Sequence, residues 1–270
     1  IDAKTAAPLV QSQALLADVP QSRMFDEMLK LLQTGHAIAT IEQLKKLGMA
    51  KGIYPLLDVA VERADTPFVK AALVDTDRRV NEGKPVAPSF LLACVLWEDV
   101  RNGWQERLNQ RQHPLPALQE AIDEVFDRRI GDVSGRGKLA ADMREIWTMQ
   151  PRFERRIGNA PLSLVEQPRF RAGFDFLRLR AQAGEADAEL ARWWEAFSLA
   201  DHDERKDLLE AARKQEAGKR QPRASTPAAA RGAPSTGDAD TGPDDVAAPA
   251  KKRRRRRRKP AGEGAGATSG

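Results

Sequence analysis

The sequence contains one cysteine, three histidines and no apolar stretch long enough to cross a membrane. One cysteine cannot form an internal disulfide or a thiolate zinc site, and Cys94 lies in the apolar run FLLACVLW, where we expect a buried thiol. A bilayer-spanning helix needs about 20 apolar residues, and the N-terminal IDAKTAAPLV lacks a basic leader and a secretory core. These absences predict a soluble protein of a reducing cytoplasm with no membrane partner.

Complete catalytic constellations are also missing, because no Gly-rich phosphate loop, nucleophile elbow or Cys–His pairing occurs. His36, His113 and His202 are far apart, and none has a second ligand at metal-binding spacing. Asp75 and Asp77 form a D-x-D pair, but we expect them near a helix end. Two-metal catalysis needs both carboxylates to bind the same two metal ions. We therefore expect a binding scaffold without its own metal or cofactor.

Charge is distributed unevenly along the chain. Residues 211–270 carry 15 Lys and Arg against 6 Asp and Glu, so this segment has a net charge of +9 and residues 1–210 sum to −4. From residue 217 onward, Ala, Pro, Gly, Ser, Thr and charged residues dominate, and burial cannot offset chain entropy. We predict a disordered basic tail over residues 216–270.

The tail contains nine consecutive cations, a pattern that attracts polyphosphate by counterion release without reading sequence. A solubility tail and a localisation address are the alternatives. The nine residues are Lys251, Lys252, Arg253, Arg254, Arg255, Arg256, Arg257, Arg258 and Lys259.

Apolar residues recur at helical spacing throughout the first 215 residues, and the alternation typical of strands is hardly seen. We predict an all-α fold of antiparallel helices with short connections. Proline and glycine positions place the ends of several helices. The expected helices cover residues 20–35, 38–48, 67–80, 88–101 and 116–129, one through residues 139–147 with a short basic element around 151–156, two starting near 169 and 187, and a polar helix near 204–215.

Arginines alternate with aromatic residues between residues 143 and 180, which is typical of a surface that holds a nucleic-acid backbone and stacks bases. For each single arginine, a surface ion pair with a nearby Asp or Glu is the favoured alternative, and only the clustering supports a nucleic-acid role. The predicted RNA-binding residues of this region are Arg128, Arg129, Arg136, Lys138, Arg152, Arg155, Arg156, Arg169 and Arg171.

The aromatic residues of this region are at helical spacing, where core residues are more common than stacking platforms. We expect Phe170 and Phe174 to be buried, and we leave the position of Phe153 open because it lies between arginines. Leu190, Trp193, Trp194 and Phe197 share one stripe, which predicts that the helix near residue 187 docks on the core.

Several segments resemble the C-terminal region of bacterial poly(A) polymerases, class II nucleotidyltransferases related to the CCA-adding enzymes. They are RMFDEMLKLLQTG at 23–35, TDRR at 76–79, PSFLLACVLW at 88–97, REIWTMQPRFERR at 144–156, QPRFRAGFDFLRLRA at 167–181 and RWWEAF at 192–197, so the similarity covers about residues 1–197. An arginine-rich tail is a further shared feature.

The resemblance implies a neck helix region over residues 1–35, a helical body over 36–130 and a helical RNA-binding region over 131–215. It implies that Arg23 and Glu27 on the neck helix shape the nucleotide pocket. In this family an α/β head supplies a Gly-Ser motif, paired aspartates, two Mg²⁺ and ATP, and the chain lacks this head. The chain begins at Ile1 rather than methionine, so we expect a piece of a longer protein that is inactive alone.

The function implied is to hold RNA 3′ ends, of mRNA and other transcripts, against an upstream head that adds AMP and so marks RNA for decay. Other RNA-decay proteins would be further partners. Two alternatives stay open: the helical part of a CCA-adding tRNA nucleotidyltransferase, and a non-enzymatic RNA-binding adaptor. The basic tail and the Trp193–Trp194 pair favour polyadenylation.

Overall fold

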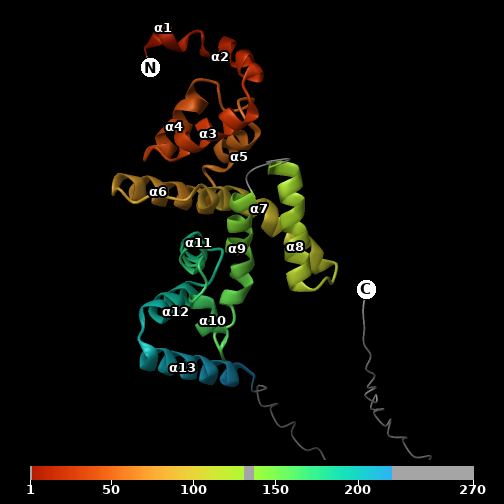
Figure 1. The fold of residues 1–270 in the computed structure, drawn as a ribbon, viewed down its shortest axis with the longest axis vertical. Coiled ribbons are helices and arrows are strands. Elements are labelled where there is room, and N and C mark those ends of the chain that lie inside the picture. The colour runs from red at the N-terminus through yellow and green to blue at the C-terminus, as the bar shows by residue number, and fades with distance from the viewer. Residues whose placement is uncertain (1, 131–136, 221–270) are drawn as a thin grey trace, which may run out of the picture. The chain divides into compact units, whose positions relative to one another are not determined.

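Every regular element that the structure describes is a helix (Figure 1). The structure is a computed structural model and describes residues 2–130 and 137–220. The elements are α1 (Ala3–Ala6), α2 (Leu9–Ser12), the 3₁₀-helix η1 (Gln13–Asp18), α3 (Gln21–Leu32), α4 (Ala37–Lys46), α5 (Pro55–Arg63), α6 (Pro67–Asn81), α7 (Pro88–Asn109), α8 (Pro114–Val125), the π-helix η2 (Phe126–Ile130), α9 (Gly137–Phe153), α10 (Ala160–Val165), α11 (Phe170–Gln182), α12 (Ala188–Leu199) and α13 (His202–Arg220). The predicted all-α fold is confirmed for these residues.

Proline marks the first residue of four successive helices, α5 to α8. A proline is tolerated there because the first N–H groups of a helix have no partner within it. The predicted starts at Pro67 and Pro88 are confirmed. Helix α8 begins at Pro114 rather than Pro116, since both prolines fit within its first turn. Helix α5 was not predicted, although Pro55 carried the same start signal.

Glycine ends the first two long helices, as predicted. Gly35 follows α3 with φ +81° and Gly48 follows α4 with φ +75°, a left-handed conformation that residues with a Cβ rarely adopt. The Asn81 side chain donates a hydrogen bond to the Gly35 carbonyl at 3.0 Å and so joins this turn to the end of α6.

Helix α7 is longer than predicted, because it continues past Arg101 to Asn109. Its last two turns pack on α8: the Trp104 indole donates to the Pro114 carbonyl at 2.9 Å, and Arg107 pairs with Glu124 at 2.8 Å. Gly103 faces this contact, since a Cβ there would lie 3.4 Å from the Ala121 Cβ, an ordinary contact distance. Contacts with another helix therefore outweigh the helix-weakening effect of a glycine.

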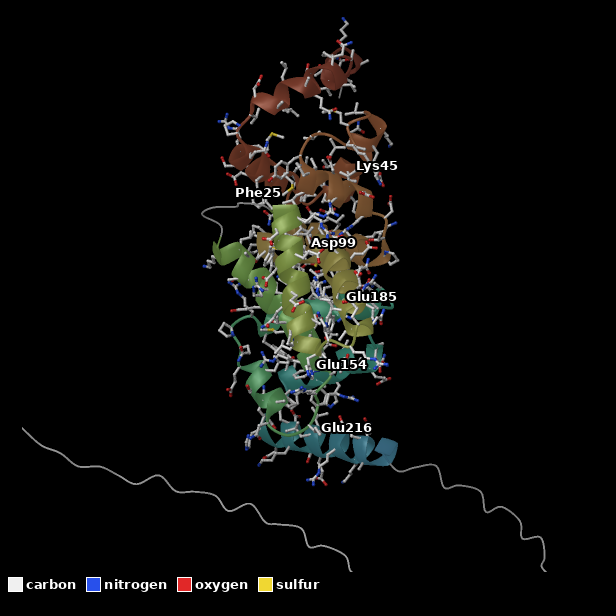
Figure 2. The ribbon with its side chains drawn as sticks, turned by 90° about the vertical axis from the view of Figure 1, so that its right-hand side faces the viewer. Phe25, Lys45, Asp99, Glu154, Glu185 and Glu216 are labelled. Carbon is white, nitrogen blue, oxygen red and sulfur yellow. The ribbon has the colours of Figure 1, made fainter. Side chains whose placement is uncertain are left out.

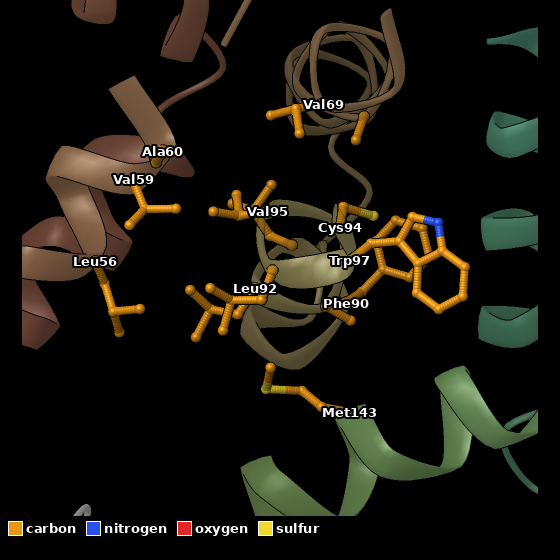
Figure 3. Packing of buried hydrophobic residues seen from close by; sticks show 14 of the residues in the cluster. Leu56, Val59, Ala60, Val69, Phe90, Leu92, Cys94, Val95, Trp97 and Met143 are labelled. Atoms are coloured by element: carbon orange, nitrogen blue, oxygen red, sulfur yellow. The ribbon is translucent and has the colours of Figure 1, made fainter. Parts of the chain in front are cut away.

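The main core surrounds the apolar run of α7, which is buried from Phe90 to Trp97. Figure 3 shows Leu92 and Val95 directed toward α5, with Cys94 and Trp97 on another side of the helix. Cys94 is buried as predicted, and burial, with a smaller contribution from the Asp75 carboxylate, raises the pKa of its thiol. Each large apolar side chain buried in this way contributes about 1.5–3 kcal/mol.

Helix α9 continues through Pro151 to Phe153. The prediction of a short element around residues 151–156 that is separate from this helix was therefore wrong. Pro151 lies in the last turn, where its missing N–H removes one intrahelical hydrogen bond but only two residues of the helix follow. Two indole N–H groups fix α9 along its length: Trp147 donates to the Ala93 carbonyl of α7 at 3.1 Å, and Trp194 of α12 donates to the Phe153 carbonyl at 2.8 Å.

A second apolar cluster lies between the end of α9 and helices α10 to α12. It consists of Met149, Phe153, Leu164, Phe170, Phe174, Leu177, Leu190, Trp194 and Phe197. The expected burial of Phe170 and Phe174 is confirmed at 8% and 2% exposure, and the predicted docking of α12 is confirmed by buried Leu190, Trp194 and Phe197.

The described residues belong to one compact unit. Helix α13 extends to Arg220, so the predicted start of the tail at residue 216 falls inside this helix. The main core combines residues from Phe25 to Leu179 and thus crosses the boundaries expected after residues 35 and 130. The assignment of separate roles to neck, body and RNA-binding region stays a prediction.

Candidate nucleic-acid interface

The two aspartates of the D-x-D pair have separate structural roles. Asp75 accepts hydrogen bonds from Arg78 at 2.8 Å and Arg178 at 3.2 Å. Asp77 instead accepts from the first backbone N–H groups of α4, at 2.7 Å from Ala37 and 3.3 Å from Ile38. It therefore caps a helix that lacks a capping side chain of its own. Within residues 2–130 and 137–220, no group of three His, Cys, Asp or Glu side chains could hold a metal ion.

Arg128 and Arg129, both predicted to bind RNA, lie on η2 and already contact carboxylates. Arg128 pairs with Glu124. Arg129 pairs through Nε with Asp99 at 3.0 Å, and the same carboxylate accepts from Arg63 at 2.6 Å (Asp99 is labelled in Figure 2). Burial acts to raise the pKa of Asp99, but the hydrogen bonds from Arg63 and Arg129 outweigh it and hold the pKa below its usual value. Arg129 thus joins η2 to α5 and α7.

Arg169 and Arg171 at the start of α11 also have carboxylate partners. Arg169 pairs with Asp142 of α9 at 2.5 Å, and Arg171 pairs with Asp175 one turn further along α11 at 3.1 Å. The Arg171 side chain is nevertheless 71% exposed, so part of its guanidinium stays accessible. An RNA-binding role for these two residues stays a prediction.

Three predicted arginines at the end of α9 have no carboxylate partner among the described residues. Arg152 and Arg155 are exposed, and Arg156 is half-buried with its guanidinium 6.0 Å from the centre of the Trp193 ring. We call Arg152, Arg155 and Arg156 the α9 arginine cluster. Lys138 is exposed too, but it lies in the first turn of α9, about 21 Å from Arg152 at the helical rise of 1.5 Å per residue.

Phe153 fixes the position of the α9 arginine cluster. Its side chain is fully buried, and its ring meets the Trp194 ring edge to face with centroids 5.0 Å apart. Phe153 and its carbonyl are held by α12, and the nearby Arg152 and Arg155 are exposed to solvent. Phe153 is thus a core residue and not a stacking platform for bases.

Trp193 is the aromatic residue that adjoins the α9 arginine cluster. It is partly buried and stacks on Phe197 with centroids 4.8 Å apart. Its indole N–H is buried without a hydrogen-bond partner in the part of the chain that the structure describes. The Arg156 guanidinium over its face gives a cation–π contact that holds this arginine at the surface.

The remaining predicted residues lie elsewhere. Arg23 and Glu27 are exposed on α3, where Glu27 pairs with Lys30 at 2.9 Å. Their role beside a nucleotide pocket stays a prediction. Arg136 and the cations from Lys251 to Lys259 lie outside the described residues.

Comparison with known proteins identifies the family. The family model described as "Polymerase A arginine-rich C-terminus" matches residues 110–260, more than half of the chain. A second, described as "Probable RNA and SrmB- binding site of polymerase A", matches residues 1–61. The chain therefore belongs to the polymerase A family.

The similar proteins are poly(A) polymerases I from bacteria. The protein of Haemophilus influenzae is 32% identical over 211 residues, which cover 75% of this chain and 46% of the relative. Those of Salmonella typhi and Escherichia coli O157:H7 are 33% and 32% identical over 221 and 219 residues, with 77% of this chain and 46% of each relative covered. The chain spans about half the length of the curated relatives it matches. The predicted resemblance to bacterial poly(A) polymerases is confirmed.

Residues 1–61 were not predicted to bind RNA. This segment holds six Lys and Arg and six Asp and Glu, so its net charge is zero and no charge signal marks it. Among the residues that the structure describes, no helix has the length and apolar character that a membrane crossing requires.

Proposed function

We propose that this chain is the RNA-holding part of a bacterial poly(A) polymerase. It binds single-stranded RNA near its 3′ end, while a catalytic head adds AMP from ATP to that end. The RNA substrates are mRNA and other transcripts of the cytoplasm, and the added tail marks them for decay. Membership of the polymerase A family supports this proposal.

The α9 arginine cluster is the observation that carries the proposal. Three arginines without carboxylate partners in the described structure lie beside a buried anchor, Phe153, which fixes the backbone that carries them. When such groups neutralise phosphates, they release the cations condensed on the RNA, so binding depends strongly on salt and little on sequence. A basic surface of this kind suits an enzyme part that must accept many RNA ends.

Residues 1–61 supply a second contact in this proposal, because the family model that matches them is described as a probable binding site for RNA and SrmB. The six Lys and Arg of this segment would contact RNA phosphates, although six Asp and Glu bring its net charge to zero. A protein partner concerned with RNA decay would meet the chain at the same segment.

The described residues do not fit the Mg²⁺ and ATP sites of the reaction. Asp75 and Asp77 contact different partners, and no carboxylate cluster occurs in the described ranges. We therefore assign these ligands to the upstream head and expect the chain alone to transfer no AMP. A longer protein that contains this chain and a catalytic head, and that adds AMP to RNA, would support this proposal over a non-enzymatic adaptor.

Replacement of Arg152, Arg155 and Arg156 together with alanine tests the proposal. We expect weaker binding of single-stranded RNA and a salt slope that falls by about 2 log units per log unit of salt, from about 0.7 per lost phosphate contact. Filter binding at several salt concentrations measures the slope, and circular dichroism verifies the helices.

The matched control replaces Lys206, Arg213 and Lys214, three exposed cations of α13, with alanine. This control removes the same charge at a surface outside the α9 arginine cluster, so its salt slope should change much less. Equal slopes for the two triple variants would show that the α9 arginine cluster has no special role.

A further inference from the structure

A cavity of about 240 Å³ lies where the end of α6 and the start of α7 meet the first turn of α11. Its apolar wall is formed by Pro85, Val86, Ala87, Phe90, Pro168 and Ala172. The volume is below the lower limit of about 300 Å³ for sites of drug-sized ligands, so the cavity suits a fragment the size of one nucleobase. Residues 62–109, which supply most of this wall, fall outside both family matches.

Three guanidinium groups line the same cavity, and we call Arg79, Arg169 and Arg171 the rim arginines. Arg79 has no carboxylate partner among the described residues and is half-buried. Arg169 and Arg171 each have one such partner, Asp142 and Asp175, which leaves further N–H groups of each guanidinium available. A phosphate near these residues would therefore meet several charge-assisted donors.

Asp75 is one of two carboxylates that line the cavity, and the other, Asp175, already accepts a hydrogen bond from Arg171 at 3.1 Å. The Asp75 side chain is 10% exposed, and its Oδ1 accepts both guanidinium hydrogen bonds, from Arg78 and Arg178. Its Oδ2 accepts no hydrogen bond from the described residues. Burial acts to raise the pKa of Asp75, but the two arginines hold it below its usual value, so this carboxyl is ionised and acts only as an acceptor at neutral pH.

We propose that this cavity receives one unpaired RNA base with an exocyclic amino group, while the adjoining phosphate binds the rim arginines. The flat faces of the base lie against Phe90 and the prolines, and its amino group donates to Asp75 Oδ2. A carboxylate is a natural acceptor for the N4 amino group of cytosine, and the N6 amino group of adenine offers the same donor. Uracil has a carbonyl oxygen at that position, which a carboxylate repels.

This inference rests on the proposed function, because the base belongs to RNA that the chain already holds. Protein residues that stack a base and bind its edge add selectivity to binding that is otherwise driven by phosphates. The selectivity expected is therefore modest and independent of the α9 arginine cluster.

The test compares short single-stranded oligomers of cytidine, adenosine and uridine by fluorescence anisotropy. The unaltered chain should bind the cytidine and adenosine oligomers about fivefold more tightly than the uridine oligomer, which corresponds to one net hydrogen bond. Ala172→Leu fills the cavity and should abolish this preference. Ala181→Leu, near the end of the same helix and outside the cavity lining, should retain it.

A second pair of variants tests the rim arginines without any change of the apolar wall. Arg79→Ala should reduce the salt slope by about 0.7, the value of one phosphate contact. Lys70→Ala, an exposed cation on the same helix, should leave the slope unchanged. Arg79 has no ion-pair partner in the described structure, so its replacement should not disturb folding.

The outcomes separate the two proposals. An equal affinity for all three oligomers, or a preference that survives Ala172→Leu, would overturn the base site and leave the RNA-holding function standing. A chain that binds none of the oligomers at low salt would overturn both.

Discussion

Deletion of Lys251–Lys259 is expected to flatten the salt dependence of RNA binding by up to about 6 log units per log unit of salt. This value follows from about 0.7 for each of nine cations in contact with phosphates of single-stranded RNA. The affinity at low salt should fall as well, since each lost contact means that one counterion fewer is released when RNA binds. Filter binding over a series of salt concentrations gives both quantities.

A deletion of residues 260–268 is the matched control. It removes nine residues with a single charge, Glu263, and should leave the salt slope nearly unchanged. If the deletion of the cations also left the slope unchanged, the run would act only as a solubility tail or a localisation address.

Replacement of Trp194 with alanine should lower the free energy of unfolding by about 3–5 kcal/mol, the usual cost of removing a buried Trp or Phe side chain. Trp194 is fully buried, its N–H donates to the Phe153 carbonyl at 2.8 Å, and its ring contacts Phe153, Phe170 and Phe197. Urea unfolding followed by circular dichroism measures the change.

Leu199→Ala is the control for this experiment, because Leu199 lies on the same helix but is 79% exposed. Its replacement should change stability by no more than about 0.5 kcal/mol. Similar losses for the two variants would contradict the packing of α12 on the end of α9. In the Trp194 variant, RNA binding under folding conditions should also weaken, since Phe153 would no longer hold the α9 arginine cluster in place.

Local sequence signals predicted the helices that begin or end at a strong backbone signal. Pro67 and Pro88 mark helix starts, and Gly35 and Gly48 mark helix ends, because each residue restricts or permits a particular backbone conformation. The signals failed where contacts with distant residues determine where a helix ends. Helix α7 continues past Gly103 because α8 packs against it, and α9 continues through Pro151 because its end is held by α12.

The candidate interface could be predicted only in part, for the same reason. The alternation in PRFERR indicated both arginines and an aromatic residue, but the burial of Phe153 depends on Trp194, 41 residues further along the chain. Ion pairs of Arg129 with Asp99 and of Arg169 with Asp142 likewise join residues 30 and 27 positions apart, which sequence spacing does not reveal. Arg79 was missed as a site residue because nothing in its local sequence shows that α11 lies beside it.

Titration of the chain with a labelled single-stranded RNA at low ionic strength is the decisive test of its RNA-holding role. We expect a saturable complex whose affinity falls steeply as salt is added. Absence of any complex at low ionic strength would contradict this role.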